Sequence, residues 1–372
     1  MKNVPKVGII TINDNLNFGN RLQNYAVQEI LNDLNVENVT IKNDHKLNYK
    51  PRNLIEYHKR NIKYKIEQEK QKKINKEDKR LQKFMEFNKN INFSKKLLKA
   101  NIKNKIHNEY DYFVAGSDQI WNPNFRLSDV DFLHFADNHK KIAFSASIGV
   151  SKLPDENIQM AKEGWDKFKA ISVREDRGKE IIEEITGRND VQVLLDPTLV
   201  LPKEKWEKVI KKPDQLEQQK EKKYILKCFL GTVLEEWQEE IERIARENDY
   251  EIIDVISPES IFSEIGPSEF LYLEKNAFLI CTDSYHSCIF SIIFESPFVL
   301  FRRSDKNLAS MHSRIETLFN KFNLHYRQFN GNITEEMLKS DYEKIKEIIE
   351  KEKIRSNEFL KRALDLNTLE TY

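Results

Sequence analysis

Ala277-Phe-Leu-Ile-Cys-Thr-Asp-Ser-Tyr-His286 is the stretch from which the fold prediction starts. Its apolar residues give way to a short polar segment, and an apolar run with helical spacing begins after His286. Pro297 ends that run, and residues 298–301 have the composition of another buried strand. The pattern therefore predicts a strand, a polar loop, a helix and a second strand. Ligands bind beyond the carboxyl ends of the strands in open parallel sheets, so Asp283 and His286 are expected at a site.

The length and composition predict a two-domain globular protein. A chain of 372 residues suits two domains, and its 39% apolar and 33% charged residues fit two cores with a solvated surface. No run of roughly 18 apolar residues predicts a membrane span, because the longest candidate carries Glu295 and Pro297. The N-terminus lacks the apolar region of a signal peptide, and the 3 cysteines lie singly in apolar runs. A cytoplasmic protein with reduced, buried thiols is expected.

Strands and helices alternate along the chain, which predicts an α/β fold with parallel sheets covered on both faces. The expected strands are residues 6–12, 36–41, 111–115, 141–147, 170–173, 191–195, 224–229, 252–255, 278–281 and 298–301. Two doubly wound, Rossmann-like units of similar size account for this order. We expect a first domain at residues 1–200, a second at 223–335, and C-terminal helices at 336–372 that cross back toward the first.

Basic charge is concentrated in residues 50–108, which contain 19 Lys and Arg against 6 Asp and Glu. Helical propensity and scattered apolar positions predict a lysine-rich helical insertion or hairpin in the first domain. The charge is interpreted either as a solvated face or as a surface for peripheral docking on anionic lipid or a polyanionic glycan carrier. Nucleic acid is not expected, because no basic motif interleaved with aromatic residues is present.

The turn between the first strand and its helix is a candidate anion site. Asn17, Gly19 and Asn20 lie in this polar turn, where backbone N–H groups at the start of a helix can meet an anion. The alternative is structural, because Asn and Gly are also the residues that any tight strand-to-helix turn prefers.

Charged residues follow other predicted strands. Arg174 ends the strand at residues 170–173, where a guanidinium group can bind a carboxylate or phosphate, or pair with Glu175 or Asp176. His286 can act as acid, base or phosphate contact near neutral pH, or serve as a structural hydrogen-bonding group. Asp118, like Asp283, lies in a turn where Asp is either a functional carboxylate or a backbone partner.

The spacing motifs of other ligand classes are absent from the sequence. No Asp-x-Asp or His-x-x-x-His spacing follows a predicted strand, so no metal is expected. Gly-x-Gly-x-x-Gly and Gly-x-x-x-x-Gly-Lys are also absent, which argues against dinucleotide and P-loop binding.

Several segments together resemble the polysaccharide pyruvyl transferase family. They are Asn17-Phe-Gly-Asn-Arg-Leu-Gln-Asn-Tyr-Ala26, Val114-Ala-Gly-Ser-Asp-Gln-Ile-Trp-Asn122, Ala143-Phe-Ser-Ala-Ser-Ile-Gly149, Ile171-Ser-Val-Arg-Glu175, Leu195-Asp-Pro-Thr-Leu199, Thr282-Asp-Ser-Tyr-His286 and Ser313-Arg-Ile315. The resemblance implies a GT-B-like pair of Rossmann-type domains facing a cleft. It also implies transfer of pyruvate from phosphoenolpyruvate to a sugar of a cell-surface glycan or its lipid-linked precursor, as a ketal and without a metal or organic cofactor.

The resemblance also assigns residues. Arg174 resembles the family arginine that binds the donor, and His286 resembles its histidine at the phosphoenolpyruvate site. Many members carry Arg two residues before this histidine and Gly after it, whereas this chain has Ser284 and Ser287. A missing cation is then expected from another arginine, and the candidates are Arg302, Arg303 and Arg314.

The predicted catalytic residues are His286, Asp118 and Asp283, and the predicted substrate-binding residues are Arg174, Asn17, Gly19, Asn20, Ser117, Ser284 and Arg314. His286 is expected to act as general acid or phosphate contact, with one of the aspartates as base. Two other functions stay open at this point. One is a GT-B glycosyltransferase that uses a nucleotide sugar, and the other is a non-catalytic scaffold of glycan assembly.

Overall fold

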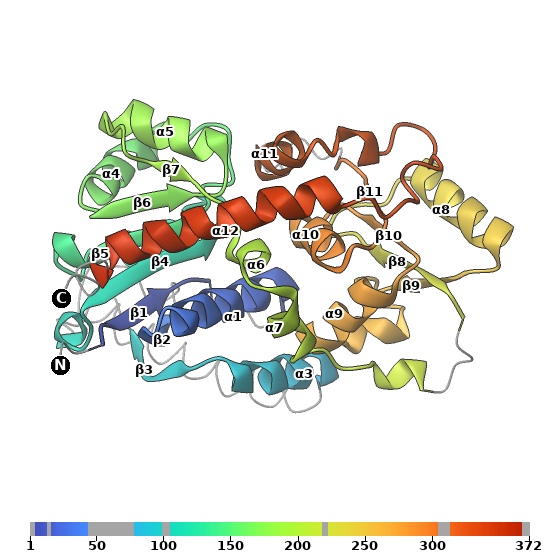
Figure 1. Ribbon diagram of the computed structural model, residues 1–372, viewed down its shortest axis with the longest axis horizontal. Helices are drawn as coiled ribbons and strands as arrows, with labels where there is room; N and C mark the ends of the chain where they lie inside the picture. The colour runs from blue at the N-terminus through green and yellow to red at the C-terminus, as the bar shows by residue number, and fades with distance from the viewer. Residues whose placement is uncertain are drawn as a thin grey trace, which may run out of the picture.

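Two parallel sheets, each covered by helices, organise the chain (Figure 1). The computed structural model describes residues 4–12, 16–43, 78–98, 105–217, 222–303 and 313–366. The first sheet has the strand order β3-β2-β1-β4-β5-β6-β7, and the second has the order β11-β10-β8-β9. All of the pairings are parallel. The predicted α/β fold of two Rossmann-like units with parallel sheets is therefore confirmed.

The strands and helices have the following bounds. The strands are β1 (Lys6–Ile10), β2 (Glu37–Asn43), β3 (Phe93–Leu98), β4 (Tyr112–Asp118), β5 (Lys141–Ala146), β6 (Ala170–Val173), β7 (Gln192–Val193), β8 (Tyr224–Cys228), β9 (Glu251–Asp254), β10 (Leu279–Thr282) and β11 (Phe298–Leu300). The helices are α1 (Phe18–Asp33), α3 (Lys79–Phe87), α4 (Asp155–Trp165), α5 (Asp176–Thr186), α6 (Pro197–Val200), α7 (Lys203–Glu207), α8 (Glu235–Asn248), α9 (Pro267–Asn276), α10 (Tyr285–Phe294), α11 (Ser313–Phe322) and α12 (Glu343–Ala363).

The prediction of a lysine-rich helical insertion or hairpin at residues 50–108 is wrong for residues 93–98. These residues form β3, which pairs in parallel with β2 and ends the first sheet. Leu98 is buried in the first unit, so its burial rather than the lysine-rich composition decides the local structure. The helical prediction holds for α3, whereas residues 50–77 and 99–104 lie outside the described residues.

Basic residues of α3 contact the second unit. Lys79 pairs with Glu264 at 3.0 Å, and Lys83 pairs with Glu269 at 2.9 Å. Arg80 donates through Nη1 to the carbonyl of Ser263 at 2.8 Å, and its guanidinium lies 4.5 Å from the ring centre of Phe18. The cations of this helix therefore meet acidic and carbonyl groups of the protein itself.

The two units share one apolar core. Phe18 of α1 stacks on Phe270 of α9 with ring centroids 4.5 Å apart, and this core continues into α10. The long helix α12 leaves the second unit and runs across the first sheet (Figure 1), where Phe359 stacks on Phe144. Packing on both sides fixes where the strand ends of the two sheets meet. Among the described residues, none of the helices has both the length and the apolar character that a membrane crossing requires.

Candidate active site between the two units

A buried set of charged and polar side chains lies where the two units meet. The first unit contributes residues from the start of α1, the end of β4, the residue after β6 and the N-cap of α6, and the second contributes the first turns of α10 and α11. We call this set the junction cluster, and its members are Asn20, Asp118, Arg174, Asp196, Tyr285, His286 and Arg314. None of them is more than 9% exposed. Parallel strands end at one edge of a sheet, which is why residues distant in the chain converge here.

Asp118 is the carboxylate at the centre of this cluster. Asn20 donates an amide hydrogen bond to its Oδ2, and the backbone N–H of Gln119 donates to its Oδ1 at 2.8 Å. Arg174 and Arg314 place Nη1 atoms 3.5 Å and 3.9 Å from the same Oδ1. Burial opposes ionisation, but the arginines, His286 and the Gln119 amide hold the pKa of Asp118 below its usual 3.8. Asp118 is therefore an ionised anchor shared by both guanidinium groups.

Arg174 is held by a second carboxylate, Asp196. Its Nε lies 2.8 Å from Asp196 Oδ2, and its Nε and Nη2 donate to Ser117 Oγ at 3.1 and 2.5 Å. Glu175 instead accepts hydrogen bonds from Ser147 and from the backbone amides of Ile148 and Gly149. Arg174 therefore pairs with groups from neighbouring strand ends, not with the acidic residues that follow it in the chain.

His286 packs directly on Gly19. A Cβ atom on Gly19 would lie only 2.1 Å from His286 Nδ1, so the start of α1 and the start of α10 touch without room for a side chain. His286 Nε2 lies 3.7 Å from Asp196 Oδ2, and among the described residues it has no hydrogen-bond partner. Burial lowers the pKa of His286 to about 4 even though Asp196 and Asp118 oppose this shift. The imidazole is therefore neutral at neutral pH.

The ring of Tyr285 lies beside both arginines of the cluster. The guanidinium carbons of Arg174 and Arg314 lie 5.6 Å and 5.0 Å from its ring centre, within the range of a cation–π contact. Burial, followed by the nearby charge of Arg174, lowers the pKa of Arg314. Arg314 Nε and Arg174 Nη1 are buried and lack hydrogen-bond partners among the described residues. An unmade hydrogen bond of this kind costs about 1–3 kcal/mol, which an anionic ligand would relieve.

Most of the predicted site residues lie together in the structure. They are Gly19, Asn20, Ser117, Asp118, Arg174, His286 and Arg314. Asn17 lies outside the cluster as the exposed N-cap of α1, where its side chain accepts the Asn20 backbone N–H at 3.1 Å. Ser284 is the buried N-cap residue of α10, immediately before Tyr285.

Asp283 belongs to a different set of contacts. Its carboxylate accepts the backbone N–H groups of Leu230 and Gly231 at 2.7 and 2.8 Å, and Arg303 Nε at 2.7 Å. Both oxygens are thus engaged within the second unit. Of the three arginines considered for the missing cation, Arg303 pairs with Asp283, Arg302 pairs with Glu316, and Arg314 enters the junction cluster.

Two members of the cluster were not predicted, Asp196 and Tyr285. Asp196 follows the expected strand at residues 191–195, and Tyr285 is next to His286 in the chain. Their positions at strand ends were the sequence signal that could have identified them as site residues. Asp196 also caps α6, accepting the Thr198 backbone N–H at 2.9 Å, and this second role hides its contact with Arg174. Within the described residues, His, Cys, Asp and Glu form no group of three that could hold a metal ion.

A parallel α/β protein of two units, with two arginines, two carboxylates and a neutral histidine between them, is equipped to bind an anionic substrate and move a proton. The family model "Polysaccharide pyruvyl transferase" matches residues 17–305. The chain belongs to this family, as the sequence segments predicted, and is a transferase of polysaccharide modification.

Solved structures similar to this chain include two UDP-N-acetylglucosamine 2-epimerases and MurG. The epimerase of Methanocaldococcus jannaschii, in complex with UDP-GlcNAc and UDP, is 17% identical, with 97% of this chain and 99% of that chain covered at a TM-score of 0.49. The putative epimerase of Listeria monocytogenes is 11% identical, with 96% and 90% covered and a TM-score of 0.49. MurG of Acinetobacter baumannii is 9% identical, with 98% and 99% covered and a TM-score of 0.41. No curated protein sequence matches the chain.

Proposed function

We propose that this protein transfers pyruvate from phosphoenolpyruvate to two hydroxyl groups of a sugar, forming a ketal. The acceptor is a cell-surface glycan or its lipid-linked precursor, met in the cytoplasm or at the inner face of the membrane. The observation that carries the proposal is the junction cluster, in which Arg174, Arg314 and His286 meet at the boundary of the two units in a member of this family.

The arginines account for binding of the donor. Phosphoenolpyruvate carries a carboxylate and a phosphate, both of which accept hydrogen bonds from arginine. The buried Nη1 of Arg174 and Nε of Arg314 donate no hydrogen bond to any described residue, so both can donate to this ligand. The N-terminus of α1, beside Gly19, adds the positive end of a helix dipole. In this proposal Arg314 supplies the cation that many relatives carry at the position of Ser284.

His286 is proposed as the group that moves protons. In one concerted step, a neutral imidazole can pass the proton of the first sugar hydroxyl to the methylene carbon while the hydroxyl oxygen bonds to the central carbon of phosphoenolpyruvate, because addition without protonation would leave a carbanion. Asp118 and Asp196 would stabilise the positive charge that develops on the imidazole during this transfer. The second hydroxyl oxygen then bonds to the same carbon while the carbon–oxygen bond to phosphate breaks, and its proton leaves with the phosphate. The products are the ketal and inorganic phosphate.

The contacts of Asp283 support phosphoenolpyruvate over a nucleotide sugar as donor. In the turn after β8, the backbone N–H groups of Leu230 and Gly231 are the kind of pair that could bind a phosphate of a nucleotide sugar. Both N–H groups instead donate to the Asp283 carboxylate, so neither is available to such a phosphate. In this proposal Asp283 therefore organises the turn, and Asp118 is the carboxylate nearest to the chemistry.

The test is phosphate release from phosphoenolpyruvate with a panel of glycans and lipid-linked sugars as acceptors. Release should require an acceptor, and the acceptor should gain the mass of pyruvate less water. His286→Gln should lower kcat by at least about 100-fold, the usual value of a general acid–base group. Arg302→Gln, which removes an arginine outside the cluster, should leave the rate unchanged. Stabilisation by a nucleotide sugar but not by phosphoenolpyruvate would instead support glycosyl transfer.

A further inference from the structure

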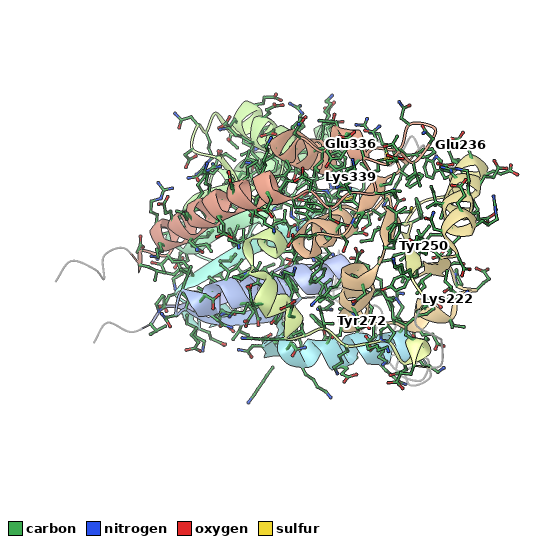
Figure 2. The ribbon with its side chains drawn as sticks, turned by 45° about the vertical axis from the view of Figure 1, so that its right-hand side comes forward. Lys222, Glu236, Tyr250, Tyr272, Glu336 and Lys339 are labelled. Atoms are coloured by element: carbon green, nitrogen blue, oxygen red, sulfur yellow. The ribbon has the colours of Figure 1, made fainter. Side chains whose placement is uncertain are left out.

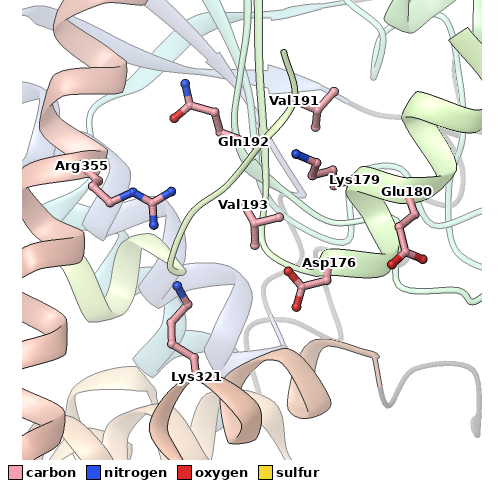
Figure 3. A pocket seen from close by; sticks show the side chains of 8 residues that line it. All are labelled: Asp176, Lys179, Glu180, Val191, Gln192, Val193, Lys321 and Arg355. Atoms are coloured by element: carbon pink, nitrogen blue, oxygen red, sulfur yellow. The ribbon is translucent and has the colours of Figure 1, made fainter. Parts of the chain in front are cut away.

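A pocket of about 540 Å³ lies outside the junction cluster, between α5, β7, α11 and α12. Figure 3 shows its lining, to which both units and the crossing helix contribute. The lining residues are Asp176, Lys179, Glu180, Val191, Gln192, Val193, Lys321 and Arg355. The volume falls within the range of small-molecule sites, about 300–1,000 Å³, and is larger than a lone phosphate needs. Its size, and a lining that combines charged and amide side chains with two valines, fit a sugar residue.

The charges on the walls of this pocket are unevenly distributed. Lys321 and Arg355 point into it from α11 and α12 (Figure 3), and both pair with one carboxylate, Glu352, at 3.2 and 2.6 Å. One carboxylate cannot neutralise two cations, so this wall keeps an excess of positive charge. The α5 wall is mixed: Lys179 lies 3.5 Å from Glu183, and Glu180 pairs with Arg177 at 2.8 Å. Hydroxyl groups can donate to its carboxylates, and an anionic group fits the opposite wall.

The pocket is adjacent to the junction cluster along two helices. Asp176 follows Arg174 by two residues, and Thr317 follows Arg314 by three, just under one helical turn. Thr317 Oγ1 donates to Asp176 Oδ2 at 3.0 Å and accepts the Asp176 backbone N–H at 3.1 Å. These bonds join α5 to α11, so two of the helices that line the pocket are tied together close in sequence to Arg174 and Arg314.

We propose that this pocket binds an acidic sugar residue of the acceptor glycan, with its carboxylate or phosphate group at Lys321 and Arg355 and its hydroxyl groups at the α5 wall. The assignment to the acceptor rests on the proposed function, whereas the binding of an acidic sugar does not. In this proposal one residue of the glycan is anchored here, while another part of the same glycan carries the hydroxyl groups that react. Specificity for the acceptor would then come from the charge of a sugar residue that is not the one at which the ketal forms.

Isothermal titration of the full chain with glucuronic acid, a glucose phosphate and glucose tests this proposal. At least one acidic sugar should bind, and glucose should bind at least about tenfold more weakly, because only the acidic sugars make charge-assisted hydrogen bonds. Lys321→Gln, which removes a cation, and Gln192→Tyr, which fills the pocket, should each weaken binding about tenfold. Lys222→Gln is the matched control: Lys222 is likewise paired with an acidic residue, Asp249 at 3.5 Å, but it lies on the second unit (Figure 2) and does not line the pocket.

The outcomes separate this proposal from the proposed function. Binding of the uronic acid alone would assign a carboxylate to the pocket, and binding of the sugar phosphate alone would assign a phosphate. Equal affinity for glucose, or unchanged affinity in folded Lys321→Gln and Gln192→Tyr proteins, would overturn the pocket assignment. Turnover of phosphoenolpyruvate without any binding of acidic sugars would also overturn the pocket assignment, but it would support the proposed function. Acidic-sugar binding in a protein that does not bind phosphoenolpyruvate would support the pocket assignment and overturn the proposed function.

Discussion

The contact between Gly19 and His286 makes the smallest residue of the site one of its most constrained. Ordinary helix propensity favours Ala over Gly by about 1 kcal/mol, yet a Cβ here would lie 2.1 Å from the imidazole. His286 would have to turn away from Asp196 to make room. The same steric argument explains how α1 and α10 approach closely enough to share one site.

Gly19→Ala is therefore predicted to separate activity from stability. We expect kcat to fall at least about tenfold because displacement of a proton-transfer group disturbs geometry that catalysis needs within a fraction of an ångström. The free energy of unfolding should fall by no more than about 2 kcal/mol, since about 1 kcal/mol of helix propensity offsets part of a crowding cost of about 1–3 kcal/mol. Steady-state kinetics and denaturant unfolding measure the two effects. Full activity in Gly19→Ala would show that His286 does not need its position against α1.

The depressed pKa of His286 predicts a stability effect at acid pH. The unfolded chain takes up this proton near pH 6.5, but the folded protein does so only near a pKa of about 4. The stability contribution is therefore fully present above pH 6.5 and is lost as the pH falls toward 4, by about 2–3 kcal/mol. Denaturant unfolding of the parent and His286→Gln at pH 4, 5.5 and 7 should show the parent losing stability relative to the variant. Parallel pH profiles would contradict a buried, neutral imidazole.

The helix pair α9–α10 contains a buried carboxyl group close to the site. Glu274 of α9 is fully buried, and its Oε1 accepts a hydrogen bond from Ser287 Oγ of α10 at 2.6 Å. The hydroxyl groups of Ser287 and Ser291 favour its ionised form, but burial outweighs them and raises the pKa of Glu274 well above 4.5. Ser287 immediately follows His286, so the bond fixes the first helical turn that carries the imidazole.

Glu274→Gln is predicted to stabilise the protein increasingly as the pH rises. Above pH 4.5 the unfolded chain ionises Glu274 while the folded protein keeps it protonated, so the parent loses stability over that range and Gln, which cannot ionise, does not. The amide can still accept the Ser287 hydrogen bond. Thermal unfolding should give nearly equal midpoints at pH 4.5 and a higher midpoint for Glu274→Gln at pH 8. A difference independent of pH would mean that this carboxyl group is not held neutral.

At the scale of the whole molecule, α3 connects the units through partners of unequal burial. Lys83 pairs with Glu269, whose side chain is only 4% exposed, whereas Lys79 pairs with Glu264, which is 46% exposed. An ion pair between exposed groups contributes little to the free energy of unfolding. A buried carboxylate that loses its cation, in contrast, still carries the cost of desolvation and destabilises the fold.

Lys83→Gln should therefore lower the free energy of unfolding by about 1–3 kcal/mol, while Lys79→Gln should lower it by less than about 1 kcal/mol. The two substitutions remove the same charge from the same helix, which makes Lys79→Gln the matched control. Denaturant unfolding at low salt distinguishes them. Equal effects would show that α3 does not depend on the buried partner.

Sequence patterns predicted the strands and helices of both sheets wherever burial produces long apolar runs. They failed at β3, because an edge strand needs few buried side chains and the lysines of residues 93–98 carry a solvated-helix composition. The site was predicted in part. Arg174 and His286 follow strands and could be named, but Asp196 looks like an ordinary helix cap, and the meeting of Arg314 with Asp118 depends on how the two units pack.

Phosphoenolpyruvate titration by calorimetry, which needs no knowledge of the acceptor, is the measurement that tests the central claim most directly. The parent should bind, and Arg314→Gln should bind at least about tenfold more weakly while remaining folded, because it removes a buried donor aimed at the anion. Arg302→Gln should bind like the parent, since that arginine pairs with Glu316 outside the cluster. Absence of binding to the parent, or equal binding by Arg314→Gln, would contradict the assignment of the junction cluster as the donor site.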